Sequence, residues 1–480
     1  MVDVIIIGAG VIGCAAAHIL SCYQLEVLVV EQGPDVACAT SRANSGIVHG
    51  GYDPRPGTLM AGLNVRGNEI FPALCRDLDV PFRRTGSLVI AREGEEGLLE
   101  NLLARGRSNG VPALTIIGRD EVFKGEPNLS PDIVAALYAP TAGIVSPWEL
   151  TLALAEVAAA NGVKFLFNTR VTQVLTAEDG VQGVETERGQ FASGVVINAA
   201  GINADLLARM AGAERYDLTP RKGEYLLLDK DLDGYVNHVV FPLPTPVSKG
   251  ILVLPTVEGN LLAGPTAVNA EDREDVGTTR AGLAEVFRGA RRLFPNLPLN
   301  RVIASFAGLR AVPEDGDFVI RSSARVRGWI DAGGIQSPGL TAAPAIAEKL
   351  VDLVGGLLTL EPKEHFLTER KVLRLRDLPL PEREQWIGKN PQFGRIVCRC
   401  EGVSEGEIVA ALHSPVPATT LDGLKQRTRA GSGRCQGGFC QPRLLALVAR
   451  ELGIRPEQVT KSGTGSEMLT GRLDKGGRGA

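Results

Sequence analysis

Apolar and polar residues follow a clear order at the start of the chain. Residues 2–31, VDVIIIGAGVIGCAAAHILSCYQLEVLVVE, begin with a continuous apolar run that predicts a buried strand. A glycine-rich turn follows, then a run of small apolar residues that predicts a helix, and then a second apolar strand that ends in Glu31. This order predicts the first strands of a parallel α/β sheet.

Two later blocks continue the pattern. Residues 168–204 predict successive β-strands, the last of which runs into Ala199-Ala200-Gly201. Residues 328–354 predict another strand, a Gly333-Gly334 turn, a loop, and a helix that begins near Thr341. The N-terminus of this second helix can also face an anion or an electron-rich ring. We therefore expect three distant segments to meet around one extended ligand.

Composition narrows the class of protein. The 480 residues are 44% hydrophobic and 22% charged, which is typical of a globular protein with two or three domains. The net charge of −4 is too small to favour nucleic acid or an anionic membrane as a partner. Glu348, Lys349 and Asp352 interrupt the most apolar late segment, and MVDVIIIGAG leaves no room for a signal peptide. The sequence thus predicts a cytoplasmic protein without a membrane span.

The N-terminal turn predicts a dinucleotide site. Gly8 would make the tight turn, Gly10 would admit a pyrophosphate, and Gly13 would let the helix meet the strand. Glu31, 18 residues beyond Gly13, would accept ribose hydroxyls. This fingerprint alone does not choose between NAD and FAD. The candidate ligands are Gly8, Gly10, Val11, Ile12, Gly13 and Glu31.

Four cysteines near the C-terminus have the spacing C-x-C-x34-C-x4-C. Four thiolates can hold a 2Fe–2S cluster, and the glycines nearby let backbone N–H groups approach the sulfurs. Zinc is the alternative, although it more often uses C-x2-C and histidine, and free thiols are a third. The candidate metal ligands are Cys398, Cys400, Cys435 and Cys440, whereas Cys14, Cys22, Cys38 and Cys75 are scattered.

These segments resemble the FAD-dependent oxidoreductases of the D-amino-acid oxidase and glycerol-3-phosphate dehydrogenase superfamily over roughly residues 1–365. The resemblance implies that Val171 contacts adenine and that the Ala-Ala-Gly strand end lies by the ribose and pyrophosphate. It also implies that SRANSG runs along the pyrophosphate and isoalloxazine, and that the later Gly-Gly-Ile segment borders the flavin. The further residues so implied are Ser41, Arg42, Asn44, Ser45, Gly46, Ala200, Gly201, Gly334, Ile335, Gly339, Leu340 and Thr341.

The cysteine segment, including TRAGSGRCQGGFC, resembles the bacterioferritin-associated-ferredoxin-type 2Fe–2S domain. Such a domain also ends the A subunits of anaerobic glycerol-3-phosphate dehydrogenases, which the whole chain resembles most. The implied fold is mixed α/β (α+β), with a Rossmann-like FAD-binding domain, an interleaved antiparallel-sheet substrate domain and a small helical 2Fe–2S domain. The expected divisions are FAD binding at about 1–80, 145–215 and 325–365, substrate binding at about 81–144 and 216–324, a linker at 366–394, the cluster domain at 395–450, and a poorly ordered tail at 451–480.

Candidate catalytic residues lie on three segments. His49 is on a glycine-flanked loop that the family places near the flavin, and an imidazole suits proton transfer at neutral pH. It could instead only bind the flavin or tether the loop. Tyr52 lies on the same loop, and His238 could also reach the cavity. Arg310 follows a Gly-Leu pair that resembles the superfamily's anion-binding loop.

Lys249 or Lys222 could add the second charge that a phosphate dianion needs, although either could be a solvated surface lysine. Arg310 with one lysine would favour phosphate over a monocarboxylate. The leading interpretation is flavin-dependent oxidation of sn-glycerol 3-phosphate to dihydroxyacetone phosphate, with electrons leaving through the 2Fe–2S cluster to partner acceptor subunits, a second flavoprotein or an iron–sulfur protein. Such partners could hold the protein at the inner face of the membrane. The alternatives are a dehydrogenase for L-2-hydroxyglutarate or another 2-hydroxy or 2-amino acid, and a non-catalytic electron-transfer subunit.

Overall fold

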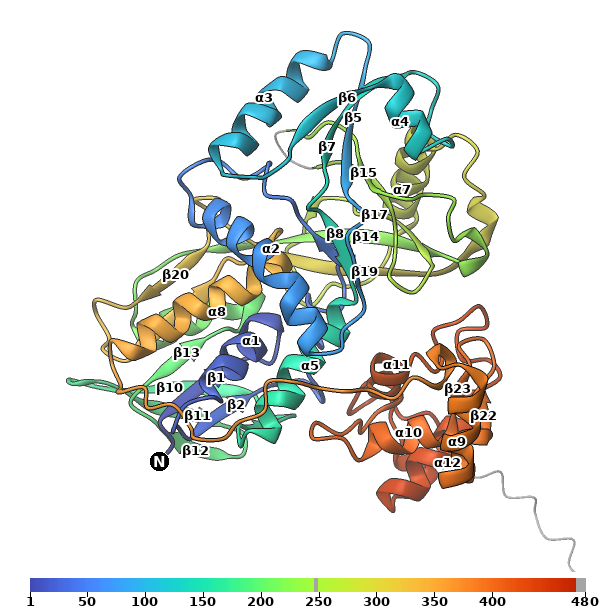
Figure 1. The fold of residues 1–480 in the computed structure, drawn as a ribbon. Coiled ribbons are helices and arrows are strands. Elements are labelled where there is room, and N and C mark those ends of the chain that lie inside the picture. The colour runs from blue at the N-terminus through green and yellow to red at the C-terminus, as the bar shows by residue number, and fades with distance from the viewer. Residues whose placement is uncertain (246–248, 472–480) are drawn as a thin grey trace, which may run out of the picture. The chain divides into compact units, whose positions relative to one another are not determined.

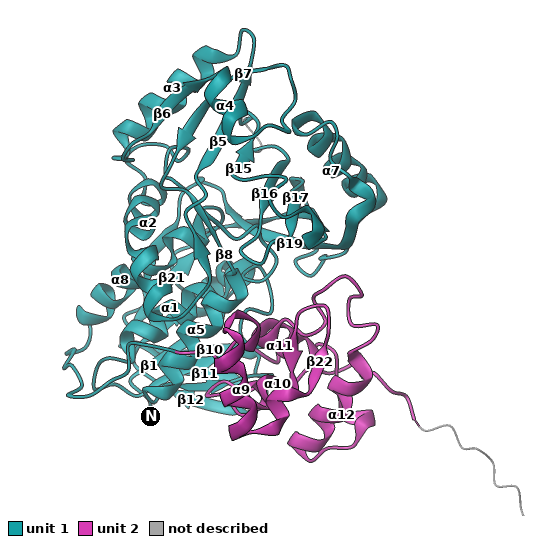
Figure 2. Cartoon of the chain, turned by 45° about the vertical axis from the view of Figure 1, so that its right-hand side comes forward, with its two compact units in different colours: residues 1–32, 36–370 teal, residues 33–35, 371–480 magenta. Residues whose placement is uncertain are grey.

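The computed structural model describes residues 1–245 and 249–471. It divides into two compact units, residues 1–32 with 36–370 and residues 33–35 with 371–480 (Figure 2). In the described residues, the first unit contains two large sheets and two small ones (Figure 1).

The first sheet is mostly parallel and has the strand order β20-β21-β13-β1-β2-β9. Its central strand pairs in register with both neighbours, Ile5 lying opposite Val196 on one side and Leu28 on the other. Only β20 runs antiparallel to its neighbour among the described strands of this sheet. The bounds are β1 Val4–Ile7, β2 Val27–Val30, β9 Lys164–Leu166, β13 Val196–Asn198, β20 Val319–Ser322 and β21 Trp329–Gly333.

Helices cover one face of this sheet and a small antiparallel sheet covers the other. On the helical face α1 packs against both α5 and α8, and α8 also packs against α2. On the opposite face Ile5 and Leu28 pack with Val174 and Val184 of the small sheet around Trp329, which is fully buried. The bounds are α1 Val11–Leu20, α2 Leu59–Asp77, α5 Pro147–Ala160, α6 Ala204–Ala211 and α8 Gly339–Gly355, with β10 Val171–Ala177, β11 Gly180–Thr186 and β12 Gly189–Ala192.

The second sheet carries the order β18-β14-β17-β16-β15-β5-β7-β6, and β19 pairs with β14. Segments that fall between the parallel strands in the sequence thus form a separate, largely antiparallel layer of the structure. The bounds are β5 Ser87–Arg92, β6 Thr115–Gly118, β7 Ile133–Ala139, β14 Leu218–Leu228, β15 Val239–Phe241, β16 Leu252–Pro255, β17 Leu261–Gly264, β18 Val268–Asn269 and β19 Val302–Pro313. Its helices are α3 Glu96–Ser108, α4 Arg119–Gly125 and α7 Arg280–Leu293. A further small sheet consists of the short strands β3 Ile47–Val48, β4 Phe82–Arg83 and β8 Gly143–Val145.

The second unit is mainly helical, and its small core contains Cys398 and Cys440 together with leucines and valines. Helix α10 starts with a capping box, in which the Ser404 hydroxyl accepts a hydrogen bond from the Glu407 N–H and the Glu407 carboxylate accepts one from the Ser404 N–H. The bounds are α9 Leu380–Lys389, β22 Ile396–Cys398, β23 Val403–Ser404, α10 Glu405–Leu412, α11 Leu421–Thr428 and α12 Gln441–Leu452.

Two segments differ from the sequence expectation. Residues 371–394, expected to belong to a linker, are part of the second unit and contain α9. The expected tail is partly folded, because Val459 is fully buried and Thr460 forms a bridge with Glu467. Burial of Val459 in the core of the unit holds this stretch, which the glycine-rich composition did not reveal. Residues 472–480 of the expected tail lie outside the described residues.

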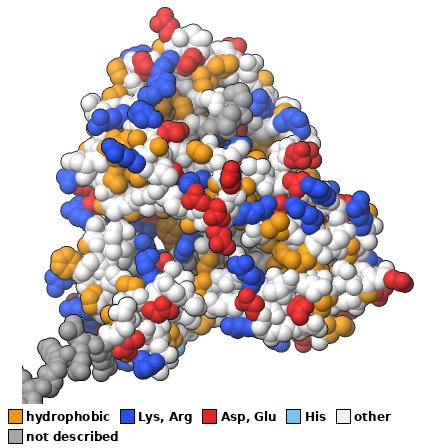
Figure 3. Space-filling view, turned by 180° about the vertical axis from the view of Figure 1, so that it is seen from behind, with side chains coloured by type: hydrophobic (Ala, Val, Ile, Leu, Met, Phe, Trp, Pro, Cys, Tyr) orange, Lys and Arg blue, Asp and Glu red, His pale blue; other side chains and the backbone are white. Residues whose placement is uncertain are grey.

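Basic and acidic side chains are interspersed on the face that Figure 3 shows, without a broad region of one sign. This agrees with the small net charge of −4. In the described part of the chain, no helix is both long enough and apolar enough to span a membrane.

Candidate active site

The glycine turn after β1 has the geometry of a ligand cradle. Gly8 has φ +104°, and a Cβ there would lie 2.5 Å from the carbonyl oxygen of Ala199. A Cβ at Gly10 would lie 3.2 Å from Ser41 Oγ, at the N-terminus of α1. At Gly13 it would collide with the carbonyl of Gly8. Gly8 and Gly13 thus bring strand and helix together, while Gly10 keeps the helix N-terminus open.

Glu31 and Ser41 attach neighbouring segments to this turn. The Glu31 carboxylate accepts a hydrogen bond from the Ala9 N–H at 2.8 Å. The Val11 N–H donates to Ser41 Oγ at 2.9 Å, which fixes the loop of residues 40–46 at the start of the helix. Asn44 stiffens that loop, because its amide donates to the carbonyls of Thr40 and Ser41 and accepts from the Gly46 N–H.

One cavity of about 460 Å³ joins these segments to distant parts of the chain. It lies in the first unit, at the carboxyl ends of the parallel strands, where ligands of open α/β sheets bind. The antiparallel sheet supplies its other wall. The sequence-predicted residues that line it are Gly10, Val11, Ile12, Ser41, Asn44, Ser45, His49, Gly201, Lys249, Arg310, Ile335, Gly339 and Leu340.

Hydrogen bonds fix both backbone groups of His49, its N–H and its carbonyl. Its N–H donates to Thr341 Oγ1 at 2.9 Å, and its carbonyl accepts from Asn64 at 3.1 Å and from Asn68 at 2.8 Å. The ring packs near Phe241 with centroids 5.9 Å apart, and its Nε2 lies 3.2 Å from Ser337 Oγ. The imidazole is therefore presented to the cavity at a fixed position.

Burial lowers the pKa of His49 well below its usual 6.5, and the positive charge of Lys249 lowers it further. The ring is consequently neutral at pH 7, with one nitrogen able to accept a proton. This is the form that a general base requires.

Cationic side chains lie on the antiparallel wall of the cavity. Arg310 on β19 donates to the carbonyl of Thr266 at 2.9 Å and is hydrogen-bonded to the hydroxyl of Tyr225. Lys249 forms an ion pair with Asp53, 2.9 Å between Nζ and Oδ2. Burial acts to raise the pKa of Asp53, but the charge and hydrogen bond of Lys249 prevail and lower it. Lys249 therefore enters the cavity with its charge already matched by a carboxylate.

Three candidates do not face the cavity. Tyr52 is buried in the core below the antiparallel sheet and does not line the cavity, so it has no access to a substrate. Lys222 pairs with Asp275 at 2.6 Å. His238 binds the buried carboxylate of Glu126 through Nδ1 at 2.8 Å.

Several predicted cofactor residues lie outside the cavity wall. Thr341, which is fully buried, holds the His49 backbone, and Gly13 packs helix against strand. The other members of this group are Arg42, Gly46, Val171, Ala200 and Gly334.

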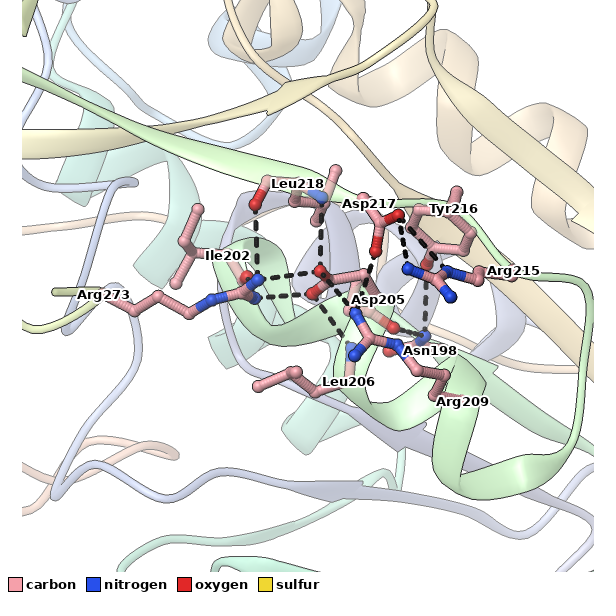
Figure 4. A network of polar contacts seen from close by, with 11 residues as sticks. Asn198, Ile202, Asp205, Leu206, Arg209, Arg215, Tyr216, Asp217, Leu218 and Arg273 are labelled. Carbon is pink, nitrogen blue, oxygen red and sulfur yellow. Dashed lines mark hydrogen bonds and ion pairs between the residues drawn. The ribbon is translucent and has the colours of Figure 1, made fainter. Parts of the chain in front are cut away.

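A buried polar network that the sequence pattern did not reveal supports the strand ends (Figure 4). Asp205 on α6, which is 1% exposed, forms an ion pair with Arg273 from the antiparallel layer. Beside it, Asn198 donates to Asp331 at 2.9 Å, joining the ends of β13 and β21. A lone Asn, Asp or Arg in the sequence carries no signal that distinguishes it from a surface residue.

The four clustered cysteines lie close together within the second unit. The sulfurs of Cys400 and Cys435 lie 3.7 Å apart, and Cys398 and Cys435 both lie close enough to Cys440 to raise the pKa of its thiol. Cys398 and Cys440 are buried, whereas Cys400 is exposed.

The pKa values of these thiols reflect their surroundings. The backbone N–H of Phe439, together with those of Gly437 and Gly438, lowers the pKa of Cys435. Burial and the neighbouring Cys398 raise the pKa of Cys440 to about 12. Crowded thiols of this kind resist ionisation without a bound cation, and backbone donors aimed at a sulfur stabilise its thiolate.

A family model described as FAD dependent oxidoreductase matches residues 3–353. The chain belongs to this family. A second model, described as a BFD-like 2Fe-2S binding domain, matches residues 396–450. The chain is 44% identical over 474 residues to a glycerol 3-phosphate dehydrogenase of Caloramator mitchellensis, an alignment that covers 98% of each protein. It is 36% identical over 369 residues to a glycerol 3-phosphate oxidase of Mycoplasma pneumoniae, covering 75% of this chain and 96% of the relative.

The fold of the first unit is also found in solved structures. A dithionite-reduced L-alpha-glycerophosphate oxidase from Mycoplasma pneumoniae with FAD bound superposes with a TM-score of 0.74 at 34% identity. The match covers 78% of this chain and 99% of that one. This oxidoreductase therefore uses FAD, and its second unit carries a 2Fe–2S domain.

The residues present fit both groups. The open helix N-terminus at Gly10 and the carboxylate of Glu31 suit a pyrophosphate and a ribose. In residues 1–245 and 249–471, no three His, Cys, Asp or Glu side chains converge on a single metal ion. The four thiols lie close together within the second unit, and backbone N–H groups are directed at Cys435, which suits the sulfur ligands of a 2Fe–2S cluster.

Proposed function

We propose that this oxidoreductase converts sn-glycerol 3-phosphate to dihydroxyacetone phosphate and delivers the electrons to a partner protein. The observation that carries the proposal is the single cavity that contains the dinucleotide turn, the neutral His49 and the cationic wall with Arg310. The identity of 44% to a glycerol 3-phosphate dehydrogenase along nearly the whole chain supports the choice of substrate.

The cationic wall would hold the phosphate. Arg310 presents a planar guanidinium that interacts with two uncharged groups, the Thr266 carbonyl and the Tyr225 hydroxyl. Lys249 can add a hydrogen bond to the phosphate while it stays paired with Asp53. With the phosphate on this wall, the carbinol C2 would lie on the His49 side of the cavity.

His49 would take the hydroxyl proton. Oxidation of the carbinol removes one hydrogen with two electrons from C2 and one proton from the oxygen, so a base beside the hydroxyl is needed. The imidazole is neutral before substrate binds, and the incoming dianion favours its protonated form because it opposes the charge of Lys249. FAD, when bound, supplies the acceptor for the hydrogen and electrons that leave C2.

The cysteine domain supports a protein acceptor. An iron–sulfur group carries single electrons, and of the four thiols Cys400 is the exposed one. We infer that the acceptor, a second flavoprotein or an iron–sulfur protein, docks beside Cys400. The proposal places the enzyme in the cytoplasm, at the inner face of the membrane only where such a partner holds it there.

Anaerobic mixing of the purified enzyme with substrate tests the function. We expect sn-glycerol 3-phosphate to bleach the flavin absorbance within the time of one turnover, and L-2-hydroxyglutarate to bleach it far more slowly. Faster bleaching by the hydroxy acid would replace the phosphate assignment with a carboxylate one. If neither compound nor a panel of 2-hydroxy and 2-amino acids reduces the flavin, the unit only relays electrons.

A further inference from the structure

Arg221 lies directly opposite Arg310 in the antiparallel sheet. The two residues are register partners on β14 and β19, and both line the cavity. We propose that Arg221 and Arg310 together form the binding site for the phosphate dianion, and that Arg221 is the residue by which the enzyme prefers a dianion over a monocarboxylate. This inference rests on the proposed function and assigns a substrate-specificity role to Arg221.

The strand geometry separates Arg221 from its neighbour Lys222. Successive side chains on a strand point to opposite faces, so only one of the two can face the cavity. Lys222 points away and pairs with Asp275 at 2.6 Å, whereas Arg221 lines the cavity and donates from Nε to the Asn269 amide oxygen at 2.9 Å. Asn269 thus orients the guanidinium at the cavity wall.

The backbone next to Arg221 leaves space for the opposing arginine. Gly223 follows two residues later on the same face, and a Cβ there would lie 2.6 Å from NH2 of Arg310. Any larger residue would push the Arg310 guanidinium out of its position over the strand. The Thr266 carbonyl then fixes that guanidinium at 2.9 Å. The two arginines are therefore built into the sheet rather than extended freely into solvent.

Electrostatics gives the pair a preference for an anion. Like charges directly opposite in a sheet are destabilising. Burial lowers the pKa of Arg221, and the charge of Arg310 lowers it further. An anion between the two guanidinium groups removes this repulsion and can accept from both. Two positive charges match a phosphate dianion, whereas a single carboxylate would leave one of them uncompensated.

Binding of inorganic phosphate, measured by calorimetry on the FAD-loaded enzyme, tests the inference without turnover. Arg221→Gln should bind phosphate about 10- to 100-fold more weakly than the wild type, as expected for loss of a charge-assisted contact. Arg221→Lys should recover part of that loss, because it restores the charge without the planar fork. Lys222→Gln is the matched control on the opposite face and should bind phosphate as the wild type does.

The pH dependence provides a second measurement. Phosphate gains its second charge near neutral pH, so the wild type should bind it more tightly at pH 8 than at pH 6. Arg221→Gln should flatten this difference, since one cation no longer distinguishes the two charge states. Flavin content and thermal midpoint of each variant show whether it is folded.

Two outcomes would overturn the inference. One is an Arg221→Gln variant that is folded, retains FAD and binds phosphate within twofold of the wild type. The other is an equal loss in Lys222→Gln. Failure of the proposed function has a different signature: glycerol 3-phosphate would not bleach the flavin, while phosphate binding would still depend on Arg221.

Discussion

A buried imidazole beside a lysine resists protonation, and this determines how His49 responds to pH. Its pKa lies well below 6.5 because of burial and, second, because of Lys249. Lys249→Ala removes the positive charge and leaves the Asp53 carboxylate, so both changes favour the imidazolium and raise the pKa. The acid limb of kcat/KM for glycerol 3-phosphate should therefore move to higher pH in this variant.

The measurement is a pH profile of kcat/KM from pH 4.5 to 8 for the wild type, Lys249→Ala and the exposed-lysine control Lys164→Ala. Because Lys249 can also contact the phosphate, the limiting rate of flavin reduction at saturating substrate is recorded at each pH together with kcat/KM, and a shift present in both is assigned to the enzyme rather than to ionisation of the free substrate. An acid limb at the same pH in wild type and Lys249→Ala would show that the limb does not belong to His49.

Replacement of Arg310 and replacement of His49 should change different kinetic parameters. Loss of a bidentate, charge-assisted contact costs about 2 to 3 kcal/mol, or roughly 30- to 150-fold in kcat/KM for Arg310→Gln. This loss should fall mainly on KM, because the phosphate does not change during the reaction. His49→Asn should instead slow flavin reduction by roughly 100- to 10,000-fold, since a base acts only as the proton leaves.

Stopped-flow reduction at several substrate concentrations separates the affinity from the limiting rate. Arg325→Gln, an exposed loop arginine, serves as the control for charge removal alone. A His49→Asn enzyme with an unchanged limiting rate would reduce His49 to a tether for its loop.

At the scale of elements, the sequence pattern predicts the positions of residues that the local backbone geometry of a turn or strand end requires. Gly8, Gly10 and Gly13 are spaced by the turn itself, and Glu31 lies at the end of the next strand, so spacing alone predicts their positions. The sequence pattern does not, by contrast, predict which face of the sheet a given side chain on a long strand occupies. In LTPRKGEYLLL nothing in the residue types tells whether Arg221 or Lys222 faces the cavity, and the register with β19 decides it.

Tyr52 shows the same limit on a loop. Its proximity to His49 in the sequence suggests a shared site, but Gly50 and Gly51 turn the chain, and Tyr52 packs in the core with its Cα and Cβ near Gly106. Gly51 has φ +100°, which allows this reversal. Long-range pairs such as Asp205 with Arg273 also depend on the tertiary fold, because 68 residues separate them.

The position of Gly10 at the N-terminus of α1 leads to a prediction about FAD binding. Gly10→Val would extend a side chain towards Ser41 and into the space in front of the helix, where a pyrophosphate would bind. The residue has φ −74°, a conformation that valine also adopts, so the protein should fold but be purified without flavin colour. Gly62→Val, on α2 with no atom within 4 Å of the added Cβ, is the control and should remain yellow.

Flavin content per chain, measured by absorbance after denaturation, decides this case. Full FAD occupancy in a folded Gly10→Val protein would move the pyrophosphate away from this turn. A colourless and unfolded variant would be uninformative by itself, so circular dichroism and the thermal midpoint are recorded with it, and Gly10→Ala provides a smaller change.

At the scale of the whole molecule, the division into two compact units predicts that substrate oxidation and electron delivery can be separated. Cys435→Ser removes the thiol whose pKa is lowered by the backbone N–H of Phe439 and its neighbours, the sulfur best prepared to be a thiolate ligand. The variant should lose the cluster absorbance and the electron paramagnetic resonance signal of the reduced cluster. Anaerobic flavin reduction by glycerol 3-phosphate should stay within about twofold of the wild-type rate, because His49 and Arg310 belong to the other unit.

Metal analysis of the wild type belongs to the same experiment, because it tests what the four thiols hold. A 2Fe–2S cluster on the four thiols predicts about two irons and two acid-labile sulfides per chain, and Cys22→Ser, outside the clustered set, should keep both. Zinc in place of iron would remove the basis for a protein acceptor and leave reoxidation of the flavin by oxygen or a small molecule as the route. A Cys435→Ser protein that retains the cluster but loses flavin reduction would contradict the separation of the two tasks, since it would make this thiol part of substrate oxidation.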